Sequence, residues 1–408
     1  MPASASVDVA APPAARRRAI PAGARGFCLV WLGSLLLLAT AVGAFDALID
    51  PYLVIGAPRI VGLNAQKPET GTHTQLAKRY LVARVRPAGL LLGTSKVDIG
   101  IDPDSPLWPD DSRPAFNDGV PGIRVGDDLA SLRARLALGT VRRVFVMLQL
   151  EDFLAPPADA PAAVPAAGTL FARAHDVLLA TLSTDAFRAS LATVAAQGGR
   201  DVLDMSPHGA TSDAAFRGAA ARDGYDTLFL QKDHTIATQL ARVAARAAAH
   251  GHALVQLDLV ADIIALCRAR HIPLDMAISP SHADYLDGLD RAGLWTEYQQ
   301  AKAALTALVA AQGDDSVRLW DFSFYDAYAT EAVPRDRRAS THWFWEPNHF
   351  KRALGEKILA TIYHGDDTFG TRLTPATLAA HLAAETAAKA AYQAHDTASR
   401  DRLARAMQ

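Results

Sequence analysis

Two polar stretches, far apart in this 408-residue chain, carry the residue types that nucleophilic catalysis uses. One is Glu346-Pro347-Asn348-His349, in which a carboxylate precedes a histidine by three residues, and the other ends in Ser95. A serine hydroxyl is a weak nucleophile at neutral pH, so a histidine must accept its proton and a carboxylate must orient that histidine. The sequence predicts a catalytic triad of Ser95, His349 and Glu346 if the fold brings the two stretches together.

Each of these residues also has a purely structural interpretation. Ser95 follows an apolar run and a Gly-Thr pair, where serine commonly caps a helix or stabilises a turn. Glu346 and His349 would equally suit the surface beside a helix that the pattern predicts over 350–363. A site is favoured because several polar groups follow apolar runs or turns, where the carboxyl edge of a parallel sheet would lie.

The elements that must position these residues are strands separated by helices. Strands are predicted where short apolar runs occur, at 88–92, 144–150, 272–279 and 317–322. Helical periodicity lies between the runs, most clearly over 125–138, 257–270 and 294–311. This alternation predicts an α/β fold with a mostly parallel sheet flanked by helices.

Three further polar residues stand where they could complete a site. Asn117 or the backbone N–H of Gly119 would donate to a developing oxyanion, with the N–H of Ser95 as a second donor. Their structural alternative is a simple Asn-Asp-Gly turn. His282 follows the run 272–279 and is a candidate substrate contact or second active-site histidine, with a helix cap or buried histidine as its alternative.

Other sequence patterns argue against a metal, a nucleotide cofactor and a nucleic-acid partner. His342 lies near His349, but no histidine and carboxylate spacing completes a zinc site, so no metal is expected. The sequence contains no glycine-rich phosphate loop or dinucleotide fingerprint, so no cofactor is expected. The aromatic residues Trp343, Phe344 and Trp345 suit either a sugar-stacking platform or the core. A net charge of -2 gives no electrostatic reason to expect a nucleic-acid partner.

The N-terminal region predicts a membrane anchor. Residues 26–45 contain no charged side chain over about 20 positions, the length that a helix needs to cross the hydrocarbon core. Arginines precede this stretch and Asp46 and Asp50 follow it, so the positive-inside rule leaves the N-terminus in the cytoplasm. In a bacterium this is a single-pass inner-membrane protein whose domain is periplasmic or extracellular. A cleaved signal peptide ending near Val42-Gly43-Ala44 and a buried core helix are the alternatives.

The chain divides into four predicted regions. These are a disordered cytoplasmic tail (1–25), the anchor (26–46), an exported α/β domain (47–370) and an alanine-rich C-terminal helix (371–408). Within the domain, about 155–260 is predicted to be a helical insertion, which begins with an Ala/Pro-rich flexible segment at 155–168. Cys267 is the single cysteine beyond the anchor, so the exported domain has no internal disulfide and must be stabilised by its core.

Three motifs suggest a family. LLLGTSKVDIGID, FNDGVPG and FWEPNHF resemble, in order, blocks of the SGNH (GDSL-like) hydrolase superfamily. The resemblance is to its membrane-anchored exported branch, similar to proteins of alginate O-acetylation and teichoic-acid D-alanylation. It implies an SGNH/flavodoxin-like three-layer fold, with Ser95 as nucleophile, Gly119 and an asparagine in the oxyanion hole, and His349 as base. The chain departs from the family pattern where Glu346 replaces aspartate and where Gln149, Glu151 and Asp152 stand in place of Gly-x-Asn-Asp.

The function that this resemblance implies is serine-dependent acyl transfer or ester hydrolysis, with acetyl as the favoured acyl group. The expected substrate is an exported or envelope polysaccharide, and a membrane-bound acyl-donor protein is a further expected partner. The competing hypothesis is a catalytically inactive SGNH-like glycan-binding or assembly subunit, which Glu346 and the missing third block favour. An esterase acting on lipids or peptides is a third possibility.

Overall fold

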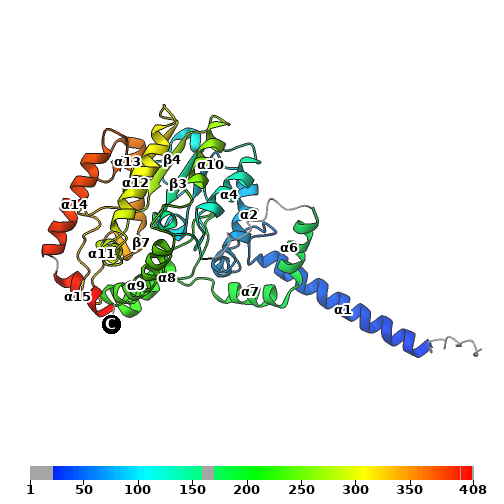
Figure 1. The fold of residues 1–408 in the computed structure, drawn as a ribbon. Helices are drawn as coiled ribbons and strands as arrows, with labels where there is room; N and C mark the ends of the chain where they lie inside the picture. The colour runs from blue at the N-terminus through cyan, green and yellow to red at the C-terminus, as the bar shows by residue number, and fades with distance from the viewer. Residues whose placement is uncertain (1–21, 159–169, 396, 407–408) are drawn as a thin grey trace, which may run out of the picture.

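The computed structural model describes residues 22–158, 170–395 and 397–406. They form an α/β fold in which helices flank a six-stranded sheet, and one long apolar helix extends away from it (Figure 1). This confirms the predicted α/β class with a mostly parallel sheet. Nearly all of the predicted disordered tail, and most of the predicted flexible segment at 155–168, lie outside the described residues.

The sheet has the strand order β2-β1-β3-β4-β5-β8. Its strands are β1 (Gly89–Leu92), β2 (Ala115–Asn117), β3 (Arg143–Leu148), β4 (Leu274–Ile278), β5 (Val317–Asp321) and β8 (Thr371–Arg372). All neighbours run parallel except β5 and β8, which are antiparallel. From β1 the chain moves outward to β2 and then returns to β3 on the other side of β1. Open parallel sheets bind ligands in the crevice at such a reversal, beyond the carboxyl ends of the strands.

The central strands are buried on both faces. Leu90 and Leu92 pack into a cluster with α4, α10 and α12, whereas Leu91 points into a second cluster on the opposite face with α13. Parallel strands that are covered on both faces are apolar at most positions, which explains the nearly continuous apolar runs in the sequence. The helices that flank the strands are α2 (Thr74–Val85), α3 (Ser95–Gly100), α4 (Val125–Leu136), α5 (Glu151–Leu154), α10 (Leu257–Arg268), α11 (Ala283–Arg291), α12 (Trp295–Ala310) and α13 (Arg352–His364).

The described residues between α5 and α10, in the region of the predicted insertion, form four helices. They are α6 (Leu170–Leu182), α7 (Thr184–Ala195), α8 (Ala214–Asp223) and α9 (Tyr225–Ala249). Residues 198–226 have weak periodicity, which favours a long surface excursion within this insertion. They contain α8, where alanines supply helix propensity without a clear apolar stripe.

The C-terminal region contains more than the single helix predicted over 371–408. Residues 371 and 372 form the edge strand β8, and α14 (Leu378–His395) and α15 (Thr397–Ala406) follow it. Each of these helices is held to the domain by a charged side chain in the interior, Glu385 on α14 and Arg402 on α15. The described residues also include two short 3-10 helices, Pro68–Gly71 and Asp110–Ser112, and a separate two-stranded sheet of β6 (Phe344–Glu346) and β7 (His349–Phe350).

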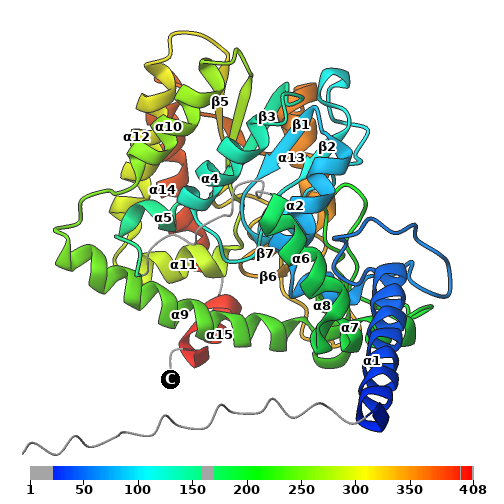
Figure 2. The ribbon, with the colours of Figure 1, turned by 90° about the vertical axis from the view of Figure 1, so that its right-hand side faces the viewer.

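The apolar N-terminal helix α1 (Ala22–Ile49) projects from the domain (Figure 2). Its stretch Gly23–Ile49 has 27 residues and is long and apolar enough to cross a membrane. At 1.5 Å per residue such a helix is about 40 Å long, more than the ~30 Å hydrocarbon core. None of its most apolar 18-residue window is buried against the domain, which rules out the core-helix alternative for this fold.

Candidate active site

Ser95 stands at the carboxyl end of β1, beside the reversal in strand order. The chain leaves β1 through Gly93, whose φ of +142° is a backbone conformation that favours glycine. A Cβ on Gly93 would also lie only 2.6 Å from a methyl carbon of Val97. Thr94 then caps α3 by accepting a hydrogen bond from the backbone N–H of Lys96 at 3.4 Å. Ser95 is the first residue of α3, and its side chain is partly exposed.

His349 and Glu346 belong to a separate two-stranded hairpin formed by β6 (Phe344–Glu346) and β7 (His349–Phe350). The hairpin pairs Glu346 directly with His349 across the two-residue turn Pro347-Asn348. Side chains on directly opposite residues of a hairpin lie on the same face. The three-residue spacing seen in the sequence therefore places the carboxylate beside the imidazole without any helix.

The three candidate residues form a hydrogen-bonded chain. Ser95 Oγ lies 2.7 Å from His349 Nε2, and His349 Nδ1 is hydrogen-bonded to Glu346 Oε1. With the Nδ1 proton donated to the carboxylate, Nε2 can accept the proton of the serine hydroxyl. The fold thus brings together groups that are 254 residues apart in the sequence. This is the arrangement that general-base activation of a serine requires.

The surroundings keep Glu346 charged. Burial alone would raise the pKa of this carboxyl, but His349, Lys232 at 3.8 Å and the backbone N–H of Asn348 at 3.0 Å together lower its pKa below the ordinary value. Only 5% of Glu346 is exposed, so water competes weakly for these contacts. A charged carboxylate at this position would stabilise the imidazolium that forms when His349 accepts a proton.

His282 supports the hairpin and does not face the candidate site. Its backbone N–H donates to the carbonyl oxygen of Pro347 at 3.0 Å. One ring nitrogen accepts from the backbone N–H of Asp284 at 3.2 Å, which caps α11, and the other lies 2.9 Å from the carbonyl oxygen of Glu331. Because both ring nitrogens are bonded within the fold and the side chain is buried, the predicted substrate contact is replaced by the capping alternative.

Asn117 and Gly119 also differ from their predicted role as oxyanion donors. The amide nitrogen of Asn117 donates to the carbonyl oxygens of Val97 and Ile101, at 2.7 and 2.9 Å, and its oxygen accepts from the N–H of Gly119 at 3.1 Å. Both predicted donors are therefore engaged beneath α3. A Cβ on Gly119 would lie 2.8 Å from the backbone nitrogen of Asp98, so glycine is needed there for close packing.

Three residues near the site were not predicted from the sequence to have a functional role. Gln149, at the end of β3, donates from its side-chain nitrogen to Thr94 Oγ1 at 2.9 Å. Lys96 follows Ser95, and burial lowers its pKa against the opposing effects of Glu151 and Glu346. The ring of Phe216, on α8, lies 5.2 Å from that of His349. The strand-end position of Gln149 was a usable signal, whereas Phe216 lies in a segment of weak periodicity that favours a surface excursion.

The aromatic residues Trp343, Phe344 and Trp345, the last two of which lie in the first strand of the hairpin, belong to the core. Phe344 and Trp345 are 0% and 6% exposed, and Trp343 is partly buried against the same cluster. This agrees with the core alternative and leaves no exposed platform of three rings. Phe216 stacks on Trp345 with ring centroids 5.8 Å apart, so the buried indole supports the ring that lies beside His349.

A groove of about 310 Å³ opens beside the hairpin. Its lining includes Asn348 next to His349, Tyr285 from α11, and Glu151 and Asp152 at the start of α5. Burial, reinforced by the charge of Glu151, raises the pKa of Asp152 to about 7. Polar groups with a shifted pKa that line a groove next to a serine and histidine pair are typical of a substrate approach.

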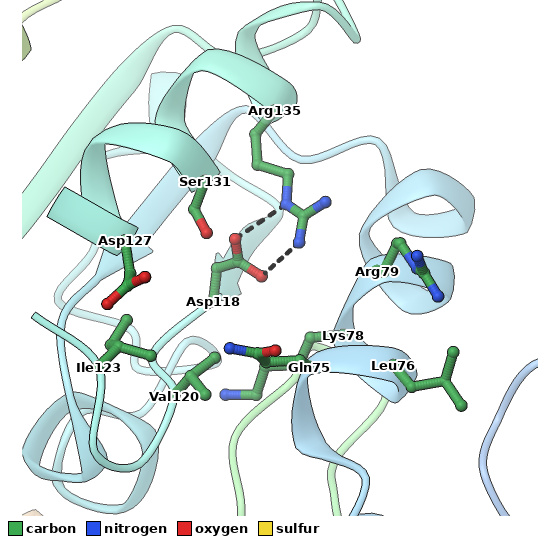
Figure 3. Close-up of a pocket in the computed structure, with 10 residues that line it drawn as sticks. All are labelled: Gln75, Leu76, Lys78, Arg79, Asp118, Val120, Ile123, Asp127, Ser131 and Arg135. Atoms are coloured by element: carbon green, nitrogen blue, oxygen red, sulfur yellow. Dashed lines mark hydrogen bonds and ion pairs between the residues drawn. The ribbon is translucent and has the colours of Figure 1, made fainter. Parts of the chain in front are cut away.

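A second cavity, of about 160 Å³, lies between α2, α4 and the loop after β2 (Figure 3). Its most prominent polar groups neutralise each other, because Arg135 donates two hydrogen bonds to Asp118, at 2.9 and 3.1 Å. Ser95, His349 and Glu346 line neither cavity, but Asn348, the neighbour of His349 in the hairpin turn, lines the groove and not this cavity. We therefore place the candidate active site at the hairpin groove and not here.

Within the described ranges, no group of three or more histidine, cysteine or acidic side chains is arranged to hold a metal ion. Comparisons with family models, with curated proteins and with solved structures each found no match.

Proposed function

We propose that this chain is a membrane-anchored, serine-dependent acyltransferase or esterase in which Ser95, His349 and Glu346 act as one unit. The observation that carries the proposal is the 2.7 Å contact between Ser95 Oγ and His349 Nε2, with Glu346 hydrogen-bonded to the other ring nitrogen. The position of Ser95 beside the strand-order reversal supports it, because ligands of open parallel sheets bind there.

The reaction would proceed in two symmetrical steps. Ser95 Oγ attacks the carbonyl carbon of an acyl donor while His349 Nε2 accepts the hydroxyl proton. His349 then protonates the leaving oxygen, which departs and leaves an ester on Ser95. A sugar hydroxyl or a water molecule next attacks that ester and gives its proton to His349. The serine is regenerated when the proton returns to it, so atoms and charges balance in both outcomes.

The developing oxyanion needs donors other than Asn117 and Gly119. The backbone N–H of Ser95 is one, and we assign the side-chain amide of Gln149 as the second. Its nitrogen carries two N–H groups, and the contact with Thr94 Oγ1 at 2.9 Å uses only one of them. Removing one oxyanion donor costs about 10²–10³-fold in kcat in a serine hydrolase. Gln149→Leu should therefore lower kcat by roughly 10²-fold and leave KM for a small ester nearly unchanged.

The substrate class rests on the resemblance in sequence motifs. An SGNH-like three-layer domain, supported here by helices on both faces of the sheet, would transfer or remove acetyl groups on an exported or envelope polysaccharide. The apolar helix α1 and the arginines before it support a bacterial inner-membrane location with the domain on the outer side. A membrane-bound protein that supplies the acyl group would be its partner.

A fluorophosphonate probe tests the proposal on the full chain, because it reacts covalently with an activated serine. We expect labelling of the parent chain and of Ser340→Ala, a control that removes an exposed serine. Ser95→Ala should abolish labelling and the hydrolysis of a small acetyl ester while its thermal unfolding stays unchanged. Labelling that persists in Ser95→Ala would refute the proposal, and glycan binding without any labelling would favour an inactive binding subunit.

A further inference from the structure

Helices α6 and α7 form a bent pair that is fixed to the domain by one of its faces. The two helices meet at Ser183 with a bend of 58°. Ala180, Ala186 and Ala189 on their inner face pack against Tyr52 and Tyr80. Asp176 on α6 also binds the domain, since it accepts hydrogen bonds from Arg79 at 2.7 Å and from Tyr80 at 2.8 Å.

The opposite face of the pair is apolar and exposed. We call this the outer face, and its residues, with their exposed fractions, are Leu170 (87%), Phe171 (84%), Leu178 (56%), Leu179 (51%), Leu182 (51%), Phe187 (38%) and Leu191 (49%). Large apolar side chains that are exposed to this degree occur, among the described residues, in only two other places. These places are the helix α1 and the segment 55–61 that follows it. The remainder of the domain surface, where it is described, presents none.

The outer face continues directly from the apolar surface of α1. A Cβ on Gly43 would lie 3.1 Å from a methyl carbon of Leu182, so the absence of a side chain allows α6 to approach α1 closely. The rings of Phe45 and Phe187 meet edge to face with centroids 6.0 Å apart. Both contacts involve the last turns of α1, at its domain end, and the views agree that α6 and α7 lie beside that end (Figures 1 and 2).

The geometry excludes α6 and α7 as a second membrane span. They contain 13 and 12 residues, so each is at most about 20 Å long and too short for the ~30 Å core, and they could cross it only together as a broken span, which would require the docked inner face to leave the domain. The ion pair of Asp176 with Arg79 further ties the middle of α6 to α2. A short helix with one apolar face and one polar or docked face lies in the plane of the bilayer interface.

We propose that the outer face of α6 and α7 inserts into the surface of the bilayer that α1 crosses. The seven side chains of the face are hydrocarbon, exposed His175 is the polar side chain that lies among those of α6, and the face begins where the span ends. Exposed Arg188, next to Phe187, stands where it can reach lipid phosphates. A single helix leaves the domain free to swing about its end. A second contact beside it fixes the tilt of the domain, and with it the height of Ser95 above the membrane.

The proposal does not depend on the catalytic role of Ser95, and it is tested on the full chain. In a Cys28→Ser background, a nitrobenzoxadiazole label is attached at Leu178→Cys or, as the matched control, at Ala380→Cys on α14. Both positions are exposed, and Cys267 is buried and protected from the label. The chain is reconstituted in phosphatidylcholine vesicles that contain spin-labelled acyl chains, and lipid-borne quenching is compared with quenching by aqueous iodide.

We expect lipid-borne quenching at position 178 to exceed that at position 380 by roughly threefold or more, with the opposite order for iodide. Equal lipid-borne quenching at the two positions would overturn the proposal. A second result would also overturn the proposal. Position 178 would be shielded from iodide without lipid-borne quenching, and the shielding would increase with the protein-to-lipid ratio, because a second copy of the chain would then cover the outer face. Unchanged thermal unfolding of both labelled chains confirms that the substitutions are tolerated.

Discussion

Two of the histidine and carboxylate pairs among the described residues lie at different depths in this fold. At the hairpin, His349 joins Glu346 to Ser95 beside a groove. In the interior, His381 Nε2 lies 2.8 Å from the carboxylate of Asp321. The same carboxylate forms an ion pair with Lys302 at 2.7 Å. Both pairs have similar chemistry, but only the first meets a nucleophile at an accessible edge of the sheet.

The interior pair of His381 and Asp321 joins α14 to the end of β5. Lys302 bridges Asp321 to Glu385 on α14 at 2.6 Å, and the side chains of all three residues are fully buried. Burial alone would lower the pKa of Lys302, but the two carboxylates raise it above the ordinary value. A histidine beside a carboxylate therefore marks a reactive site only when a nucleophile and access for a substrate are also present.

Replacement of His349 and of His381 by alanine should distinguish the hairpin pair from the interior pair most clearly. His349→Ala should lower kcat for an acetyl ester by at least about 10³-fold, because no base then accepts the serine proton. His381→Ala should leave kcat per folded chain within about twofold but lower the free energy of unfolding by about 1–3 kcal/mol, since a buried acceptor loses its partner. Steady-state kinetics and urea unfolding of both variants check this. A large catalytic loss in His381→Ala would break the distinction.

Substitution of Glu346 and Glu385 should give a smaller difference in activity than substitution of the two histidines. Glu346→Gln should lower kcat by about 10²–10⁴-fold, because the amide no longer holds the correct tautomer or stabilises the imidazolium. Glu385→Gln should instead reduce stability, by about 1–3 kcal/mol, and spare activity, because Lys302 loses one of its two charged partners. Glu346→Asp should keep part of the activity. Full activity of Glu346→Gln would show that the hairpin carboxylate is not part of a triad.

The pH dependence of stability gives the smallest expected difference. The pKa of Glu346 is depressed in the folded chain, so its contribution to stability is present above the ordinary pKa of 4.5 and is lost as pH falls through the folded pKa. The stability difference between the parent and Glu346→Gln should therefore shrink on acidification below about pH 4.5. Urea unfolding between pH 6 and pH 3 measures it, with Ser95→Ala as a variant that should keep the parental dependence. A stability difference that increases on acidification would contradict the expected direction of the pH dependence.

Much of the sheet could be predicted because its strands are buried on both faces. The runs at 88–92, 272–279 and 317–322 contain β1, β4 and β5, and the run at 144–150 overlaps β3, which begins one residue earlier. The short strands were missed for a physical reason. β2 has three residues and merges into the turn residues of FNDGVPG, and β6 and β7 join through a Pro-Asn turn that leaves almost no alternating pattern.

The candidate site was only partly predictable. The spacing of Glu346 and His349 was visible in the sequence, but the hairpin that pairs them was not, and His349 was expected at the edge of the main sheet. Asn117 was expected to face a substrate, yet its amide satisfies the backbone carbonyls of α3. Hydrogen-bond partners of this kind depend on tertiary packing, which local sequence patterns do not encode.

The most direct test of the central claim is detection of the acyl group on Ser95 itself. The full chain would be mixed with a small acetyl ester, quenched in acid during the first turnovers and analysed by peptide mass spectrometry. The triad predicts one added acetyl group on the peptide that contains Ser95, and His349→Ala should prevent its formation. Ester turnover without an acetylated Ser95, or with the acetyl group on another residue, would contradict the account.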